Sequence, residues 1–139
     1  MLPLKKHILL VFTILAINGA AAQTGYTLTV TVKGFKSQKG TVKLQVQNSA
    51  EKEVYQKVAP VSGKSYQLVI NNVAAGQYAV NVFHDKNNNN KLDTNWLGIP
   101  TEGWGCSNDA RGFMGAPSFK SKLVTIKKDI AITINLVHY

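Results

Sequence analysis

Residues Tyr26 to Lys33 have the sequence YTLTVTVK, in which every second side chain is large and apolar or aromatic. Because successive side chains of a β-strand point to opposite faces, this alternation predicts a strand with one buried and one solvated face. The same two-residue period recurs at Val42, Leu44 and Val46, with polar residues between them. We expect these two runs to form a hairpin across residues 34–40.

Further strand-like runs follow along the chain, and no long helical period interrupts them. They cover residues 66–70, 78–83, 123–126 and 130–136. The segment 51–58 is less regular, and its pattern is compatible with either a short helix or a loop. Six or seven short strands separated by turn signals are typical of an all-β domain. We therefore predict a single antiparallel β-sandwich of about seven strands with a Greek-key arrangement.

The first 22 residues have the pattern of a secretory signal peptide. Lys5 and Lys6 precede an apolar run that ends at Ile17, and alanines occupy positions 20–22. The run is too short for a membrane-spanning helix, which needs about 20 apolar residues. The expected division is residues 1–22 as signal peptide and residues 23–139 as the β-sandwich domain. We expect a periplasmic or extracellular protein with no membrane span after cleavage.

The charge of the chain is strongly basic. The formal net charge is +9 and falls to +7 when Lys5 and Lys6 are removed with the signal peptide. Such a balance often indicates nucleic-acid binding. Export removes that substrate, however, and Arg111 is the only arginine, so we expect no nucleic acid. The scattered lysines are interpreted as solvated strand faces that protect sheet edges, or as contacts to anionic envelope glycans.

The long run from 84 to 117 is HDKNNNNKLDTNWLGIPTEGWGCSNDARGFMGAP. An irregular stretch of this length is uncommon in a compact domain unless it is functional or held by its own packing. Its apolar side chains are expected to fold back as a cap over one end of the sandwich. These side chains are Trp96, Leu97, Ile99, Trp104, Phe113 and Met114, with Phe119 just beyond the run.

The start of this run has the spacing of a calcium-binding loop, in which oxygen ligands come from places 1, 3, 5, 7 and 9. Those places hold Asp85, Asn87, Asn89, the Lys91 carbonyl and Asp93. Asn90 stands where glycine usually makes the sharp turn, and Trp96 replaces the closing glutamate. The missing oxygen would then come from Glu102 or from a water. Only weak binding is expected, on the order of 10⁻⁴ to 10⁻³ M. The alternative is that the Asp and Asn side chains form backbone turns without an ion.

Catalytic motifs are weak in this chain. Ser107 lacks the second glycine of a nucleophile elbow, and a hydrolase built on Glu102, His84 or Asp85 would require a cleft where these groups converge. Cys106 is the only cysteine, so an intrachain disulfide is excluded. We interpret it as a buried free thiol. We expect no enzyme, and keep an envelope hydrolase as the least favoured alternative.

The polar run also resembles a known bacterial family. The residues that carry the resemblance are Gly76-x-Tyr78-Ala79-Val80, His84-Asp85-x-Asn87-x-Asn89-x-Lys91-Leu92-Asp93-x-Asn95, Gly98-Ile99-Pro100-x-Glu102-Gly103-x-Gly105-x-Ser107-Asn108 and Gly115-x-Pro117-x-Phe119. This pattern resembles the bacterial domain-of-unknown-function family 2141 over essentially the whole mature chain. The resemblance implies an exported protein with a transthyretin-like β-sandwich and no established activity. The chain departs from the pattern where Asn88 and Asn90 replace glycines and Cys106 replaces an aromatic residue.

Two classes of function stay open. The first is a small exported binding module that recognises an envelope glycan, peptide or protein partner, with Ca²⁺ as its only expected cofactor. Exposed aromatic residues would then form the contact surface. The candidate ligand-binding residues are His84, Trp96, Glu102, Trp104, Ser107 and Asn108. The second class is a structural accessory domain with a self-packed cap, which burial of both tryptophans would favour. The oligomeric state is not predicted.

Overall fold

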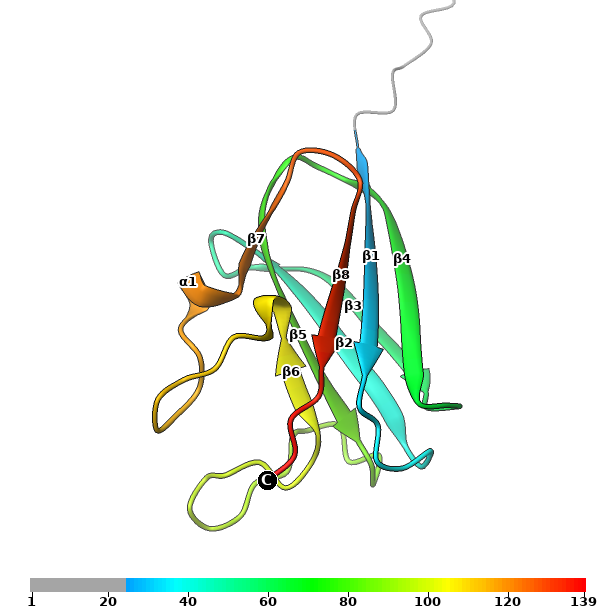
Figure 1. The fold of residues 1–139 in the computed structure, drawn as a ribbon, viewed down its shortest axis with the longest axis vertical. Helices are drawn as coiled ribbons and strands as arrows, with labels where there is room; N and C mark the ends of the chain where they lie inside the picture. Colours follow the sequence, from blue (N-terminus) through cyan, green and yellow to red (C-terminus); the bar gives the residue numbers. More distant parts are fainter. Residues whose placement is uncertain (1–24) are drawn as a thin grey trace, which may run out of the picture.

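The computed structural model describes residues 25–139, which form two packed β-sheets (Figure 1). The expected signal peptide, residues 1–22, lies outside the described residues. The strands are β1 (Tyr26–Lys33), β2 (Thr41–Asn48), β3 (Glu53–Pro60), β4 (Ser65–Val73), β5 (Gly76–Asp85), β6 (Trp104–Cys106), β7 (Leu123–Ile126) and β8 (Ile130–Asn135). The structure also contains two short helical turns, the 3₁₀ turn η1 (Ser107–Asp109) and the α-helical turn α1 (Phe119–Lys122). Within residues 25–139, no helix has the length and apolar character needed to span a bilayer.

The two sheets divide the strands unequally. One has the order β4-β1-β8, and the other has the order β3-β2-β5-β6, with β7 also paired to β5. All pairs of neighbouring strands are antiparallel except β1 and β8, which run parallel. The prediction of an all-β sandwich is confirmed, with eight strands in place of about seven.

The core lies between the sheets and is built from the predicted alternation. Leu28, Val30 and Val32 of β1 have no exposed surface, and they pack with the inward residues of the opposite sheet, such as Leu44 and Val82. Threonines and other polar residues occupy the outward positions of β1. Burial of a side chain of this size stabilises the fold by about 1.5–3 kcal/mol, so the repeated pattern accounts for the sandwich.

Two local predictions are wrong. β1 and β2 do not form a hairpin across residues 34–40, because β1 pairs with β4 and β8 while β2 pairs with β3 and β5. Residues 34–40 instead connect one sheet to the other. The segment 51–58 is neither a helix nor a loop, since most of it belongs to strand β3. β3 is a largely exposed edge strand. Because neither of its faces is fully buried, its sequence lacks the alternation of apolar and polar residues that predicts a strand.

The site region leaves the sandwich at the end of β5. The same edge of β5 pairs with β7 through residues 76–79 and with β6 through residues 81–83. Two loops result. The first (residues 86–103) contains most of the segment 85–93 that has calcium-loop spacing, which we call the calcium-type loop, and the second covers residues 110–118. Both project from the side of the molecule that carries β6 and the C-terminus (Figure 1). The long run is therefore interrupted by a short strand and η1.

Candidate functional site

The first loop closes around the carboxylate of Asp85, the last residue of β5. Oδ1 of Asp85 accepts the backbone N–H of Asn89 at 3.1 Å, and Oδ2 accepts that of Asn90 at 2.8 Å. The side chain is fully buried, and its charge faces the Lys43 ammonium at 3.5 Å. Lys43 also donates to the Asn90 side-chain oxygen. This carboxylate therefore fixes the entry of the loop.

Asparagine turns shape the rest of the calcium-type loop. Oδ1 of Asn87 accepts the N–H of Asn89 at 3.2 Å, and Oδ1 of Asn89 accepts the N–H of Lys91 at 3.1 Å. The side-chain amides of Asn87 and Asn89 donate to the two oxygens of Asp93 at 2.6 and 2.7 Å. These bonds hold the pKa of the Asp93 carboxyl below its usual range. The side chains at places 3, 5 and 9 are thus in mutual contact.

The backbone makes its sharp turn where the sequence has asparagine. Asn88 and Asn90 both lie in the left-handed region, with φ of 58° and 70°. Asparagine adopts this conformation more readily than most residues, so the loop forms although the expected glycines are absent.

Glu102 lies beneath both ends of this loop. It is buried, with Oε1 accepting the N–H of Lys86 at 2.8 Å and Oε2 accepting the N–H of Asp93 at 3.1 Å. Both oxygens are therefore occupied by the backbone. Within residues 25–139, no three side chains of the His, Cys, Asp and Glu types gather as a metal cluster. An ion in this loop would depend on carboxamide and carbonyl oxygens beside Asp85 and Asp93.

The other predicted polar site residues also bond to their own chain. His84 is buried, with Nε2 at 2.6 Å from the Lys39 carbonyl oxygen and its ring edge-on to Phe35. Ser107 is buried and its hydroxyl accepts the N–H of Val80 at 3.0 Å. Asn108 donates to the carbonyl oxygens of Ser121 and Leu123, both at 3.0 Å. His84 thus contacts the connection between the sheets, whereas Ser107 and Asn108 contact the segment that leads into β7.

Cys106 is a buried free thiol, as predicted. Burial raises the pKa of this thiol, and its sulfur lies 3.5 Å from the Ala110 carbonyl oxygen. A neutral thiol is a poor nucleophile.

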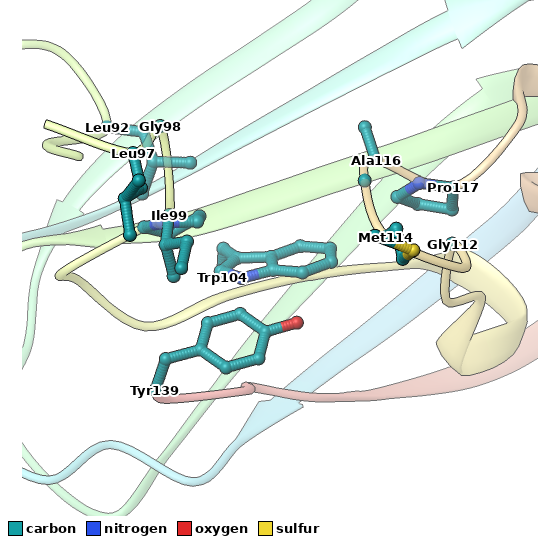
Figure 2. A pocket seen from close by; sticks show the side chains of 12 residues that line it. Leu92, Leu97, Gly98, Ile99, Trp104, Gly112, Met114, Ala116, Pro117 and Tyr139 are labelled. Atoms are coloured by element: carbon teal, nitrogen blue, oxygen red, sulfur yellow. The ribbon is translucent and has the colours of Figure 1, made fainter. Parts of the chain in front are cut away.

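An open apolar groove of about 600 Å³ lies between the two loops (Figure 2). Leu97 and Ile99 lie on the side of the first loop, and Met114 lies on the side of the second. Trp104 and Tyr139 lie between them, with ring centroids 6.5 Å apart. The full lining is Leu92, Leu97, Gly98, Ile99, Pro100, Trp104, Gly112, Met114, Gly115, Ala116, Pro117 and Tyr139.

Trp104 is the central residue of this groove. Its backbone pairs with Val137 of the C-terminal segment, through bonds of 3.1 and 2.7 Å, which ties β6 to the chain beyond β8. The Arg111 guanidinium lies over its ring at 5.5 Å from the centroid. The indole N–H is buried and is the single unpaired buried side-chain polar atom among residues 25–139. Tyr139 and Arg111 were not predicted from the sequence as site residues, because neither belongs to a recognisable motif.

The predicted cap does not form by burial of its aromatic residues. Trp96, Phe113 and Met114 are 90%, 96% and 92% exposed, and Leu97 and Ile99 are exposed as well. The expectation that all these side chains fold back over the sandwich is therefore wrong. Only Trp104 and Phe119 are partly covered.

Comparison with known proteins places this chain in one family. No curated protein matches the sequence. The family described as an uncharacterised protein conserved in bacteria, domain-of-unknown-function family 2141, matches residues 30–133. That range begins in β1, ends in β8 and includes both loops and every groove-lining residue except Tyr139. The chain belongs to this uncharacterised bacterial family.

Proposed function

We propose that this protein is a small exported binding module that contacts its partner through the groove between its two loops. The calcium-type loop forms one wall of the contact surface and binds Ca²⁺ weakly. The observation that carries the proposal is the exposure of Trp96, Phe113 and Met114 beside an apolar groove. A contiguous apolar patch on a folded domain usually marks an interaction site. Export is supported by the sequence pattern of residues 1–22.

The exposure of Trp96 at the loop tip supports a binding module over a structural domain. A structural domain with a self-packed cap would bury both tryptophans, whereas Trp96 is almost completely exposed. Aromatic residues of this kind dominate the energy of protein interfaces and stack on sugar rings. The unpaired N–H of Trp104 supports a ligand that brings a hydrogen-bond acceptor, because a buried donor without a partner costs about 1–3 kcal/mol.

Three features of the loop support calcium binding. The Asp85 carboxylate draws the backbone of residues 89 and 90 around itself. Asn90 makes the left-handed turn that the sixth place of such a loop requires. The side chains of Asn87, Asn89 and Asp93 already converge, and rotation of the two amides would turn oxygens toward an ion.

The proximity of Lys43 to Asp85 limits the affinity. A cation at the loop would meet an ammonium group 3.5 Å from the first carboxylate, and no glutamate stands at place 12. We therefore expect a dissociation constant on the order of 10⁻⁴ to 10⁻³ M.

The test is thermal unfolding of the purified protein in chelator and then in rising Ca²⁺. A ligand that binds only the folded state raises the midpoint as its concentration passes the dissociation constant. The variant Asn87→Ala/Asp93→Ala should lose this response. The matched control Asn71→Ala/Asp129→Ala, which removes the same residue types from outside the loop, should retain it. A flat response of the wild type up to millimolar Ca²⁺ would refute the metal part of the proposal.

A structural accessory domain is the second candidate. It is favoured by the closed set of hydrogen bonds among Asn87, Asn89 and Asp93, which shapes the loop without an ion. Under this alternative, Ca²⁺ leaves the midpoint unchanged, and removal of Trp96 affects neither stability nor binding.

A further inference from the structure

The two loop tips hold large apolar side chains away from the protein. In the first tip, the Asn95 side chain accepts the N–H groups of Leu97 and Ile99 at 2.9 and 3.0 Å. The Asn95 backbone bonds the carbonyl oxygen of Ile99 at 2.9 Å as well. This closed turn fixes the backbone on both sides of Trp96 while its side chain projects into solvent.

The second tip is equally tight. Gly112 approaches Gly115 so closely that a Cβ on Gly112 would lie 2.3 Å from the Gly115 carbonyl oxygen. Phe113 and Met114 lie between the two glycines and are nearly fully exposed. At the base of this loop, Asp109 binds the backbone and side chain of Asn135 at 2.8 and 2.7 Å. The base of this loop is therefore anchored to the end of β8.

The tips belong to one surface. Residues 97–100 of the first loop and residues 112 and 114–117 of the second line the same groove (Figure 2). Trp96 and Phe113 each adjoin a lining residue in the sequence. We call Trp96, Leu97, Phe113 and Met114 the apolar tips.

The exposed charges of residues 86–120 are of one sign, and the formal net charge of this segment is +1, from four basic and three acidic side chains. Among residues 86–120, the charged side chains classed as exposed are Lys86, Lys91, Arg111 and Lys120, all basic. The acidic residues of the same segment are less accessible. Glu102 is buried, and Asp93 and Asp109 are half-buried and hydrogen-bonded. The Arg111 guanidinium lies over the ring of Trp104, which lines the groove, and donates to the carbonyl oxygens of Ala110 and Asn135. Lys91 directly precedes the lining residue Leu92 in the sequence.

We infer that the apolar tips insert into the headgroup region of an anionic lipid bilayer, with the surrounding basic residues facing the lipid phosphates. The inference names the partner of the surface proposed above and rests on that proposal for the location of the contact. Peripheral membrane binding typically combines shallow insertion of apolar side chains with attraction of basic side chains to anionic lipid. Trp in particular favours the membrane interface.

The shape of the surface favours a bilayer over a soluble partner. The apolar tips come from two separate loops, and Trp96 and Phe113 are almost completely exposed, so the protein itself does not cover them. A bilayer accepts such side chains without shape complementarity, whereas a protein or glycan partner would require a matched surface. The exposed basic side chains of the same segment add an attraction to anionic lipid.

The test is co-sedimentation of the purified protein with vesicles of phosphatidylcholine alone and of equal parts phosphatidylcholine and phosphatidylglycerol. We expect binding to the anionic vesicles and much weaker binding to the neutral ones. Binding should fall as salt is raised, since ions screen exposed charges. Measurements in chelator and in Ca²⁺ separate lipid binding from the calcium site.

Two pairs of variants test the two components. Phe113→Ser/Met114→Ser should weaken partitioning by at least about tenfold, because two side chains lose apolar burial. Its control is Val54→Ser/Val69→Ser, which removes two half-exposed valines on the sheets. Lys91→Glu/Arg111→Glu should weaken binding more than about twentyfold at low salt, at about fivefold per charge. Its control, Lys57→Glu/Lys64→Glu, changes the net charge equally on exposed residues outside the loops.

Tryptophan fluorescence places the contact. The chain has two tryptophans, so the difference in emission between the wild type and Trp96→Phe gives the emission of Trp96 while Trp104 stays in place. The Trp96 emission should shift to shorter wavelength with anionic vesicles and be quenched by brominated lipid.

Failure of this inference is distinguishable from failure of the proposed function. If anionic vesicles leave the protein in solution while a soluble glycan or peptide shifts the Trp96 emission, the lipid partner is overturned and the binding module stands. Equal vesicle binding by the loop variants and their controls would also overturn it. If vesicles, glycans and peptides all leave the emission unchanged and Ca²⁺ does not raise the unfolding midpoint, both proposals fail.

Discussion

The Lys43 ammonium lies 3.5 Å from Oδ2 of Asp85, whose side chain is fully buried. Lys43 is on β2 and Asp85 ends β5, so the ion pair joins neighbouring strands at the point where the calcium-type loop begins. The same ammonium reaches the Asn90 side chain. One lysine therefore fixes the start and the middle of the loop.

Removing that lysine should destabilise the protein. Lys43→Met leaves the buried Asp85 carboxylate without its counter-charge, and we expect the free energy of unfolding to fall by about 3 kcal/mol. Urea denaturation measures the change. Lys57→Met, at an exposed position on β3, should change it by less than about 0.5 kcal/mol. Equal losses in the two variants would contradict the structural importance of the pair.

The buried Glu102 is expected to act through both of its oxygens. Glu102→Gln keeps the shape but leaves one oxygen for the N–H groups of Lys86 and Asp93. The free energy of unfolding should fall by about 1–3 kcal/mol, the cost of one unsatisfied buried donor. Denaturant titration tests this, with the exposed Glu53→Gln as the control. Unchanged stability of Glu102→Gln would show that water replaces the lost bond.

Two glycines with the same backbone conformation should respond differently to alanine. Gly40 and Gly98 have φ of 79° and 78°. A Cβ on Gly40 would lie 2.1 Å from the Asp85 carbonyl oxygen, whereas a Cβ on Gly98 would meet nothing within 4 Å.

We therefore expect Gly98→Ala to cost about 1–2 kcal/mol from backbone strain alone. Gly40→Ala should cost more, because the connection between the sheets must also move away from β5. Thermal or urea unfolding of the two variants gives the comparison. If both lose the same stability, the approach of Gly40 to the loop entry is less close than the structure indicates.

The pKa of Asp93 predicts a dependence on pH. The amide groups of Asn89 and Asn87 lower the pKa of this carboxyl in the folded state. The unfolded state therefore binds the proton more readily, so the stabilisation is present above about pH 4 and is lost as the pH falls through the folded pKa.

NMR titration of the Asp93 carboxyl carbon measures this value directly. Asn87→Ala/Asn89→Ala should raise the pKa toward its ordinary value, and Asn71→Ala should leave it unchanged. A low pKa that survives in the double variant would assign the shift to another cause.

The buried face of β1 could be predicted from the sequence, whereas strand β3 and the strand pairing could not. The alternation at Leu28, Val30 and Val32 predicts a buried face directly, since the side-chain period of a strand is fixed. β3 was missed because an exposed edge strand carries no such period. The hairpin was predicted wrongly because sequence neighbours usually pair, whereas residues 34–40 cross from one sheet to the other.

The sequence by itself determined the all-β class, the family and the position of the calcium-type loop, because these depend on local periodicity and spacing. The tertiary structure alone decided which residues meet. It brought Lys43 to Asp85, placed Tyr139 beside Trp104 and left Trp96 and Phe113 in solvent. These relationships depend on contacts between segments far apart in the chain. Residue spacing along the chain does not predict such contacts, because strand pairing and loop packing depend on the interactions of the whole folded molecule.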